Sequence, residues 1–319
     1  MSGEIRQRLL GQLWSRLRCP ACRRPMPVKT MVGELVCDGC GAHYPVLPGG
    51  VPILLAPEQA QRFRKILESE PDGQHMAAEY RRFGTWSARL RNAIKPPSIV
   101  HDEDVARKHA GIYDPYGENT LVLSIGGGPG RENPRAINLN IDAFDSVDMV
   151  GDGCNIPLQD DTCDTVTCNA VIEHVSNPRA LVAEMYRVLK PGGYAQLMVP
   201  FVFPFHAYPK DFQRYSMSGI LELTRSFDKV ELCVLTGPTS ALLVLFREYL
   251  RLIVPGGNNR VVRTVLNGLS GWMTFPLKYL DLILNRKPEA AHLAAAFYYL
   301  GRKRGSNASY GISRPGDAD

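Results

Sequence analysis

The sequence predicts an α/β fold: a doubly wound, mostly parallel seven-stranded sheet that ends in an antiparallel strand, with a small cysteine-rich unit before it. From Thr120 onward, short apolar stretches alternate with segments of helical periodicity, which is typical of a sheet covered by helices on both faces. Two Cys-x-x-Cys pairs precede this region in a stretch rich in proline and glycine. An apolar helical insertion is expected just before the last strand.

The apolar stretches place the seven strands at 120–125, 137–141, 147–150, 164–169, 193–199, 229–235 and 296–303. Helices are expected at 178–189 and 216–226, and two apolar-striped helices at 240–254 and 260–285, the second broken or kinked by Pro276. The chain then divides into an amphipathic helix (1–17), a cysteine-rich unit (18–56), a helical connector (57–115), a sheet domain (116–304, with its insertion at 240–288) and a disordered tail (305–319).

Composition narrows the class of protein. Of the 319 residues, 45% are hydrophobic and 22% charged, which suits a packed core, and the net charge of +5 is too small and too dispersed to favour a nucleic-acid ligand. No apolar run reaches the roughly 18 residues that a membrane-spanning helix needs. The first 18 residues lack the pattern of a secretory signal. We therefore expect a cytoplasmic protein, with peripheral attachment to a membrane left open.

Four cysteines have the spacing of a metal site. Cys19 and Cys22 form one pair, Cys37 and Cys40 form the other, and 14 residues separate the pairs. Two such knuckles can direct four thiolates at one point, which is the geometry of structural Zn²⁺. A redox pair would usually open a helix in a thioredoxin-like unit, and neither pair does. Since four thiolates leave no position for water, the predicted zinc is structural, and the nearby His43 is expected to pack rather than bind.

The stretches CPACRRPM and LVCDGCGAHYPVLPGGVPILL resemble a known zinc ribbon. They are similar to the small activator subunit that partners tRNA and translation-factor methyltransferases, and the resemblance covers residues 18–56. The role of the ribbon is left open among three alternatives: stabilising the chain, presenting a surface, or helping to hold a substrate.

A glycine-rich turn and two acids indicate a nucleotide-like cofactor. Gly126, Gly127, Gly128 and Gly130 follow the first strand of the sheet, where the missing β-carbons let backbone approach a ligand. Asp142 ends the second strand, where a carboxylate can bind ribose hydroxyls, and Asp152 follows the third. Each acid alone would most often be a turn residue. In this order, the set predicts cofactor binding.

The segments IPLQDDTCDTVTCNAVIEHV and RVLKPGG, with the glycine turn before them, resemble the class I S-adenosylmethionine (SAM)-dependent methyltransferases of the type 11-like group. The resemblance implies a Rossmann-like seven-stranded sheet and SAM as cofactor. It assigns the loop to Gly126, Gly128 and Gly130, the ribose to Asp142 and the adenine side to Asp152 and Gly153. Asn169 and Ala170 would line the methionine side, and His174 would shape the structure.

Two features depart from that family. Ser124 stands where the family often has an acid that orients the amino group of methionine, and serine can hydrogen-bond there but carries no charge. The segment RENPRA is also too short for the usual helix of three turns, so the first crossover is expected to be abbreviated.

The acceptor site is expected in the loop after the fifth strand, which begins PFVFPFHAYP. The string H..P.DF.RY resembles a loop of small-molecule methyltransferases. His206 is the candidate general base because its unperturbed pKa lies near neutrality. The alternative is that His206 and Asp211 only hold the loop.

The leading hypothesis is SAM-dependent O-methylation of a small molecule, such as a sugar or a lipid-linked glycan intermediate. The alternatives are an RNA or protein methyltransferase, and a non-catalytic SAM-binding scaffold that docks a partner through the zinc ribbon. The insertion at 240–288 fits three roles: a packed cap, a lid, or a contact with a membrane surface.

Overall fold

The computed structural model describes residues 10–60 and 120–305, apart from 27, 28, 32, 48, 49, 129, 130, 132–134, 145, 208, 209 and 258. Most of the expected connector at 57–115, nearly all of the tail and the first half of the N-terminal helix lie outside the described residues. Within them, residues 10–14 are helical, as the amphipathic pattern predicts.

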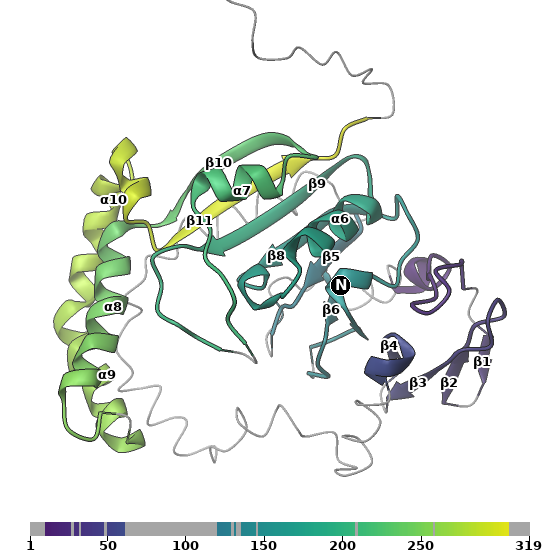
Figure 1. Cartoon of the computed structure of the whole chain (residues 1–319), viewed down its shortest axis with the longest axis horizontal. Coiled ribbons are helices and arrows are strands. Elements are labelled where there is room, and N and C mark those ends of the chain that lie inside the picture. Colours follow the sequence, from purple (N-terminus) through teal and green to yellow (C-terminus); the bar gives the residue numbers. More distant parts are fainter. Residues whose placement is uncertain are drawn as a thin grey trace, which may run out of the picture.

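The predicted seven-stranded sheet is present. Its strands run in the order β7-β6-β5-β8-β9-β11-β10, and β11 is antiparallel to both of its neighbours whereas the pairs from β7 to β9 are parallel (Figure 1). The strands are β5 (Val122–Ile125), β6 (Ile137–Asn140), β7 (Met149–Gly151), β8 (Cys163–Asn169), β9 (Leu189–Pro200), β10 (Asp228–Thr236) and β11 (Ala296–Arg302). All residues of β5, β6 and β7 are buried, and most of them are apolar; Ser124, Asn138 and Asn140 are the polar exceptions.

Short helical elements follow the strands. After β7 comes the 3₁₀ helix η2 (Gly153–Asn155), and after β8 come η3 (Ile172–His174) and α6 (Pro178–Val188). The next helix is α7 (Met217–Leu223), so both helices predicted here are confirmed. Asn177 caps α6 by accepting from Ala180 N at 3.2 Å. The crossover between β5 and β6 contains no helix in its described residues, as its length predicts.

The cysteine-rich unit (residues 18–56) extends the same sheet. Its strands are β1 (Lys29–Met31), β2 (Glu34–Val36), β3 (His43–Leu47) and β4 (Val51–Leu54). β4 pairs in parallel with β7, with Ile53 opposite Val150. The result is an 11-stranded sheet in which the cysteine-rich unit covers an edge that would otherwise be open. Arg18 adds a side-chain contact to Glu184 Oε2 at 2.9 Å.

The helical insertion (residues 238–287) lies at the opposite end of the sheet from the cysteine-rich unit (Figure 1). It consists of α8 (Pro238–Ile253), α9 (Arg260–Thr274), η4 (Phe275–Leu280) and α10 (Asp281–Leu284), and η5 (Pro288–His292) follows it. The second long helix ends at Thr274, just before Pro276, as predicted. The buried Asp281 holds the start of α8, since its carboxylate accepts from Thr239 N at 2.8 Å and from Ser240 Oγ at 2.7 Å.

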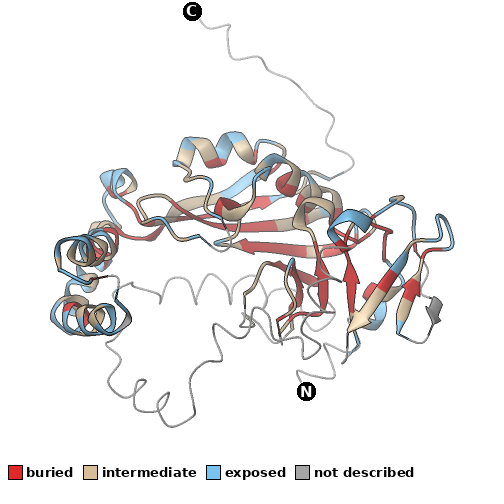
Figure 2. Cartoon of the chain, turned by 60° about the horizontal axis from the view of Figure 1, so that its bottom comes forward, coloured by how far each residue is buried: buried red, intermediate tan, exposed pale blue. Residues whose placement is uncertain are grey.

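The insertion differs from the sheet in burial. Figure 2 shows the strands as mostly buried and the two long helices as largely exposed or intermediate. Their exposed side chains include large apolar ones, with Leu252 and Met273 each 79% exposed. Among the described residues, no helix combines the length and the apolar character needed to cross a bilayer.

Candidate active site

The predicted cofactor residues lie at the carboxyl ends of neighbouring strands, on one side of the sheet. Strands β7, β6, β5 and β8 are adjacent and parallel, so their carboxyl ends face the same way. The glycine turn follows β5, Asp142 follows β6, Asp152 follows β7, and Asn169 ends β8. Ligands of open α/β sheets bind at this edge, where the strand order reverses.

The glycine turn requires glycine at two positions. Gly126 has φ +73°, and a β-carbon there would lie 2.5 Å from Val171 Cγ2, so the turn contacts the loop after β8 directly. Gly126 N donates to Leu139 O at 2.8 Å, which ties the turn to β6. Gly128 has φ +64°, but an added β-carbon would meet no atom within 4 Å. The backbone at Gly128 therefore borders open space that a ligand can use, and Gly127 beside it is half-buried. Gly130 lies outside the described residues.

The two predicted acids are held differently. Asp142 is half-buried, and its backbone N donates to Asn140 Oδ1 at 3.1 Å. Asp152 caps η2, since Oδ1 accepts from Cys154 N at 2.8 Å, and its Oδ2 accepts from Gln59 Nε2 at 2.9 Å. Gly153 is closely packed, because a β-carbon there would lie 2.8 Å from Leu181 Cδ1. Asp152 is thus a turn residue as well as a candidate ligand, and its role toward a cofactor stays a prediction.

The residues expected on the methionine side lie at the ends of β5 and β8. Ser124 is buried and pairs with Asn138 and Thr167 on the neighbouring strands. Asn169 Oδ1 accepts from Gln196 Nε2 at 2.9 Å. Ala170 is exposed and has φ +51°, a left-handed conformation that is uncommon for alanine and is found preferentially at functional sites.

A cluster of titratable groups adjoins this position. The loop after β9 brings His206 Nε2 to 3.5 Å from Glu173 Oε1, and His174 Nε2 lies 3.8 Å from the same oxygen. The rings of His174 and His206 meet edge to face at 4.9 Å. Glu173 is fully buried, and this burial raises the pKa of its carboxyl group. We refer to Glu173, His174 and His206 as the Glu-His-His cluster.

Asp211 fixes the loop that carries His206. Its carboxylate forms a two-pronged ion pair with Arg214 and accepts from His206 N at 2.8 Å. Hydrogen bonding to Arg214 holds the pKa of Asp211 well below its usual range. Arg214 also donates to Pro204 O at 2.9 Å, which closes the loop. The loop-holding role considered for Asp211 therefore has a structural basis, whereas general-base catalysis by His206 stays a prediction.

Sequence reasoning did not identify Glu173 as a site residue. The available indication was a carboxylate in the apolar stretch AVIEHV, because a buried carboxylate needs a compensating group. The compensating His206 lies 33 positions later, and only the loop geometry shows that the two meet.

The four predicted zinc ligands converge. Cys19 Sγ lies 3.7 Å from Cys40 Sγ, and Cys22 Sγ lies 3.8 Å from Cys37 Sγ. All four sulfur atoms lie within 4.8 Å of one another. A tetrahedron with Zn–S bonds of about 2.3 Å has edges of about 3.8 Å, so the sulfur positions fit zinc. His43 points elsewhere, with Nδ1 3.0 Å from Glu34 Oε2.

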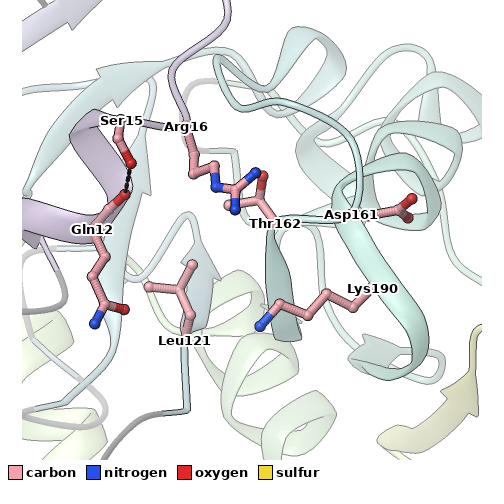
Figure 3. Close-up of a pocket in the computed structure, with 7 residues that line it drawn as sticks. All are labelled: Gln12, Ser15, Arg16, Leu121, Asp161, Thr162 and Lys190. Atoms are coloured by element: carbon pink, nitrogen blue, oxygen red, sulfur yellow. Dashed lines mark hydrogen bonds between the residues drawn. The ribbon is translucent and has the colours of Figure 1, made fainter. Parts of the chain in front are cut away.

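A separate pocket of about 260 Å³ opens at the amino ends of the strands, opposite the predicted cofactor site. Leu121 precedes β5, Thr162 precedes β8, and Lys190 is near the start of β9. Figure 3 shows Arg16 and Lys190 on two sides of this pocket, with the Asp161 carboxylate directed away. Because it lies at the amino ends of the strands, this pocket is distinct from the predicted cofactor site.

Comparisons with known proteins match parts of the chain that include the predicted cofactor site. Residues 133–197 match the family model described as "Methyltransferase domain". A malonyl-[acyl-carrier protein] O-methyltransferase of Marinomonas sp. is 32% identical over 102 residues, which are 25% of this chain and 38% of that protein. A demethylmenaquinone methyltransferase of Streptomyces griseus is 42% identical over 43 residues, which are 14% of this chain and 19% of that protein. The chain thus spans less than two fifths of the length of these relatives.

Solved structures also resemble the chain at low identity. One is a complex of the Haloferax volcanii Trm112 methyltransferase activator with a methyltransferase, 16% identical, covering 70% of this chain and 96% of that chain, with a TM-score of 0.40. Another is Haemonchus contortus phosphoethanolamine N-methyltransferase 2 in complex with SAM. It is 15% identical, and the match covers 62% of this chain and 52% of that chain with a TM-score of 0.38.

Proposed function

We propose that the chain is a class I methyltransferase that transfers a methyl group from SAM to a hydroxyl group of an apolar or lipid-linked small molecule; the family match at 133–197 and the strand order of the sheet support this. The observation that carries this proposal is the ordered set of glycine turn, Asp142 and Asp152 at one sheet edge, with the Glu-His-His cluster beside it. SAM supplies the methyl group as a sulfonium substituent.

The residues of this chain have two tasks in that reaction. Gly126 and Gly128 would admit the cofactor close to the backbone, and Asp142 would bind its ribose hydroxyls. The acceptor hydroxyl must lose its proton as its oxygen forms the new bond, so a group that promotes this loss has to lie nearby. We place the acceptor beside the Glu-His-His cluster. Glu173 and His174 of this cluster follow Ala170 closely along the chain, and His206 reaches them from the loop after β9.

The helical insertion supports an apolar or lipid-linked acceptor. Its helices expose an apolar surface, and monomeric soluble proteins seldom leave a large one uncovered without a function. Between residues 238 and 287 there are seven Lys or Arg and two acidic residues, which gives a net charge of +5. A surface that is both apolar and basic suits the interface of an anionic bilayer.

Two of the relatives named above support an acceptor that is carrier-linked or lipid-like. One is an O-methyltransferase of a malonyl-carrier protein, and another acts on demethylmenaquinone. For the cysteine-rich unit we propose structural Zn²⁺, held by Cys19, Cys22, Cys37 and Cys40, because the four sulfur atoms fit its geometry. Docking of a partner protein on this unit remains a second proposal, supported by the likeness of its sequence to the activator subunit.

The test uses SAM with a labelled methyl group. Binding is measured first by calorimetry, and the protein is then incubated with a cell extract that is separated into lipid, small-molecule, RNA and protein fractions. Label in the lipid or small-molecule fraction is expected, and it should fall at least tenfold in His206→Ala while SAM affinity stays within about twofold. Label confined to RNA or protein would show that the acceptor is a macromolecule and not a small molecule. SAM binding without any transfer would favour the scaffold alternative.

A further inference from the structure

The Glu-His-His cluster has the arrangement of a metal site. Glu173 and His174 belong to η3, which follows β8, and His206 comes from the loop after β9. One ligand atom from each residue lies within 4.8 Å of the others. A cation about 2.1 Å from each atom would need neighbouring ligand atoms about 3.0–3.4 Å apart. The observed 3.5 and 3.8 Å from Glu173 Oε1 are slightly longer, and the two imidazole nitrogens, which lie within 4.8 Å of each other, would approach the cation by rotation of the rings.

The other nitrogen of each imidazole is already occupied. His174 Nδ1 lies 2.6 Å from Lys210 O, and His206 Nδ1 lies 3.2 Å from Pro204 O. A carbonyl oxygen only accepts hydrogen bonds, so in a neutral His174 ring the proton belongs on Nδ1 and the lone pair on Nε2. His206 Nδ1 lies between two groups of opposite kind, because Arg214 Nη2, which only donates, is 3.3 Å from it. The lone pair of His174 then faces Glu173, and Nε2 of His206 faces the same carboxylate. Histidines that bind metals usually donate their second nitrogen to a carbonyl or carboxylate in this way.

Arg214 acts electrostatically on the carboxylate of Glu173, but its guanidinium pairs with Asp211. Glu173 is fully buried, and neither of its oxygens accepts a hydrogen bond within the part of the chain that the structure describes. An ionised carboxylate out of water is costly unless a charge or a metal compensates it. A divalent cation at this position would satisfy all three groups. His206 keeps 36% of its side chain exposed, so one side of the cluster stays accessible to a ligand.

We propose that Glu173, His174 and His206 bind a divalent transition-metal cation through Oε1 and the two Nε2 atoms. Two imidazoles and one carboxylate suit Zn²⁺, Mn²⁺ or Fe²⁺ and leave coordination positions open. Metal binding itself follows from the cluster alone. Its role in catalysis rests on the proposed function and deepens it, because an acceptor hydroxyl bound at an open position would lose its proton more easily.

The proposed step is balanced. The hydroxyl proton leaves to water, and the oxygen lone pair forms the new bond to the methyl carbon. The bond between that carbon and the sulfonium sulfur breaks, and its electron pair returns to sulfur, giving S-adenosylhomocysteine. The positive charge of the sulfonium is thereby replaced by the released proton, and no oxidant or reductant is needed.

Metal content measured on the full chain, stripped with a chelator and reloaded with Zn²⁺, tests the site. We expect two equivalents in the unmodified protein and one in Glu173→Gln combined with His206→Ala. His292→Ala, which changes an exposed histidine on η5, should keep two. Reloading with Co²⁺ separates the centres by absorption, because only the cysteine centre gives thiolate charge-transfer bands, and these should be unchanged in the double variant.

The outcomes separate this inference from the proposed function. A single equivalent in the unmodified, folded protein, lost on Cys40→Ser, would overturn the metal site. If the double variant does not fold by circular dichroism, Glu173→Gln alone is used, and it should weaken the second equivalent at least tenfold. Two equivalents without any methyl transfer would leave the site standing and remove the proposed function. Transfer at the full rate with only the cysteine centre loaded would remove the catalytic role of the cation.

Discussion

Gln59 Nε2 donates a hydrogen bond of 2.9 Å to Asp152 Oδ2 and so joins the segment after β4 to the acid that follows β7. The same two strands pair directly, with Leu54 opposite Gly151. The cysteine-rich unit and the predicted adenine side of the cofactor site are therefore connected through backbone and side chain. A disturbance of the cysteine centre is expected to reach the cofactor.

Removing the metal of the cysteine centre should therefore weaken SAM binding. Cys40→Ser leaves three thiolates, and the loss of structural zinc should loosen the unit that holds β4 against β7. We expect a lower melting temperature and at least fivefold weaker SAM binding by calorimetry. Cys233→Ser, in β10 at the far end of the sheet, is the matched control and should change neither. Unaltered SAM affinity in the zinc-free protein would show that the two sites are independent.

Gly126→Ala should abolish SAM binding and destabilise the fold. The new methyl group would lie 2.5 Å from Val171 Cγ2, and the residue would keep a left-handed backbone. We expect a loss of about 2 kcal/mol in the free energy of unfolding, read from urea denaturation. Gly268→Ala, in α9 with open space around it, should leave SAM binding intact and stabilise that helix slightly.

Asp142→Ala tests the ribose contact. Loss of charge-assisted hydrogen bonds to two hydroxyl groups should weaken SAM binding by about ten- to a hundredfold, with little change in stability. The control is Asp161→Ala, an exposed carboxylate at the opposite edge that pairs with Lys303 at 2.7 Å. That exposed pair contributes about 1 kcal/mol at most, and SAM affinity should not change. Equal affinities for both variants in calorimetry would mean that Asp142 is only a turn residue.

The apolar surface of the helical insertion should bind anionic membranes. Leu252→Glu combined with Met273→Glu places two charges on side chains that are 79% exposed, so the fold should tolerate them. In sedimentation with vesicles containing phosphatidylserine, the double variant should bind at least tenfold more weakly than the unmodified protein. Raising the salt concentration should also weaken the binding of the unmodified protein. Leu221→Glu, on the exposed side of α7, is the control. If the double variant instead changes the oligomeric state and leaves vesicle binding alone, the surface serves contacts between copies.

Local pattern was enough to predict the seven strands of the sheet domain and most of the helices. A strand such as β5 is buried on both faces, so its residues are apolar in sequence except for Ser124. The glycine turn was also predictable from local sequence, because glycine readily adopts the positive φ found at Gly126 and Gly128. The spacing of Cys19, Cys22, Cys37 and Cys40 fixes two knuckles, and the sulfur atoms do converge.

Relations between distant segments were not predictable in this way. Nothing in VPILL states that β4 will pair with β7, because edge pairing depends on where two separately formed units meet. The helical insertion reads as an apolar stripe whether it packs as a cap or stays exposed, and only the surrounding structure leaves Leu252 and Met273 uncovered. Glu173 and His206 likewise meet because a loop held by Asp211 and Arg214 returns to η3.

The sequence by itself determined the α/β sheet, the cysteine centre and the order of glycine turn and acids, since each follows from residue type and short spacing. Tertiary structure alone decided the joining of the cysteine-rich unit to the sheet, the exposure of the insertion and the convergence of Glu173, His174 and His206. The physical reason is that burial patterns and backbone preferences act over a few residues, whereas edges, surfaces and clustered side chains exist only after distant segments have packed together.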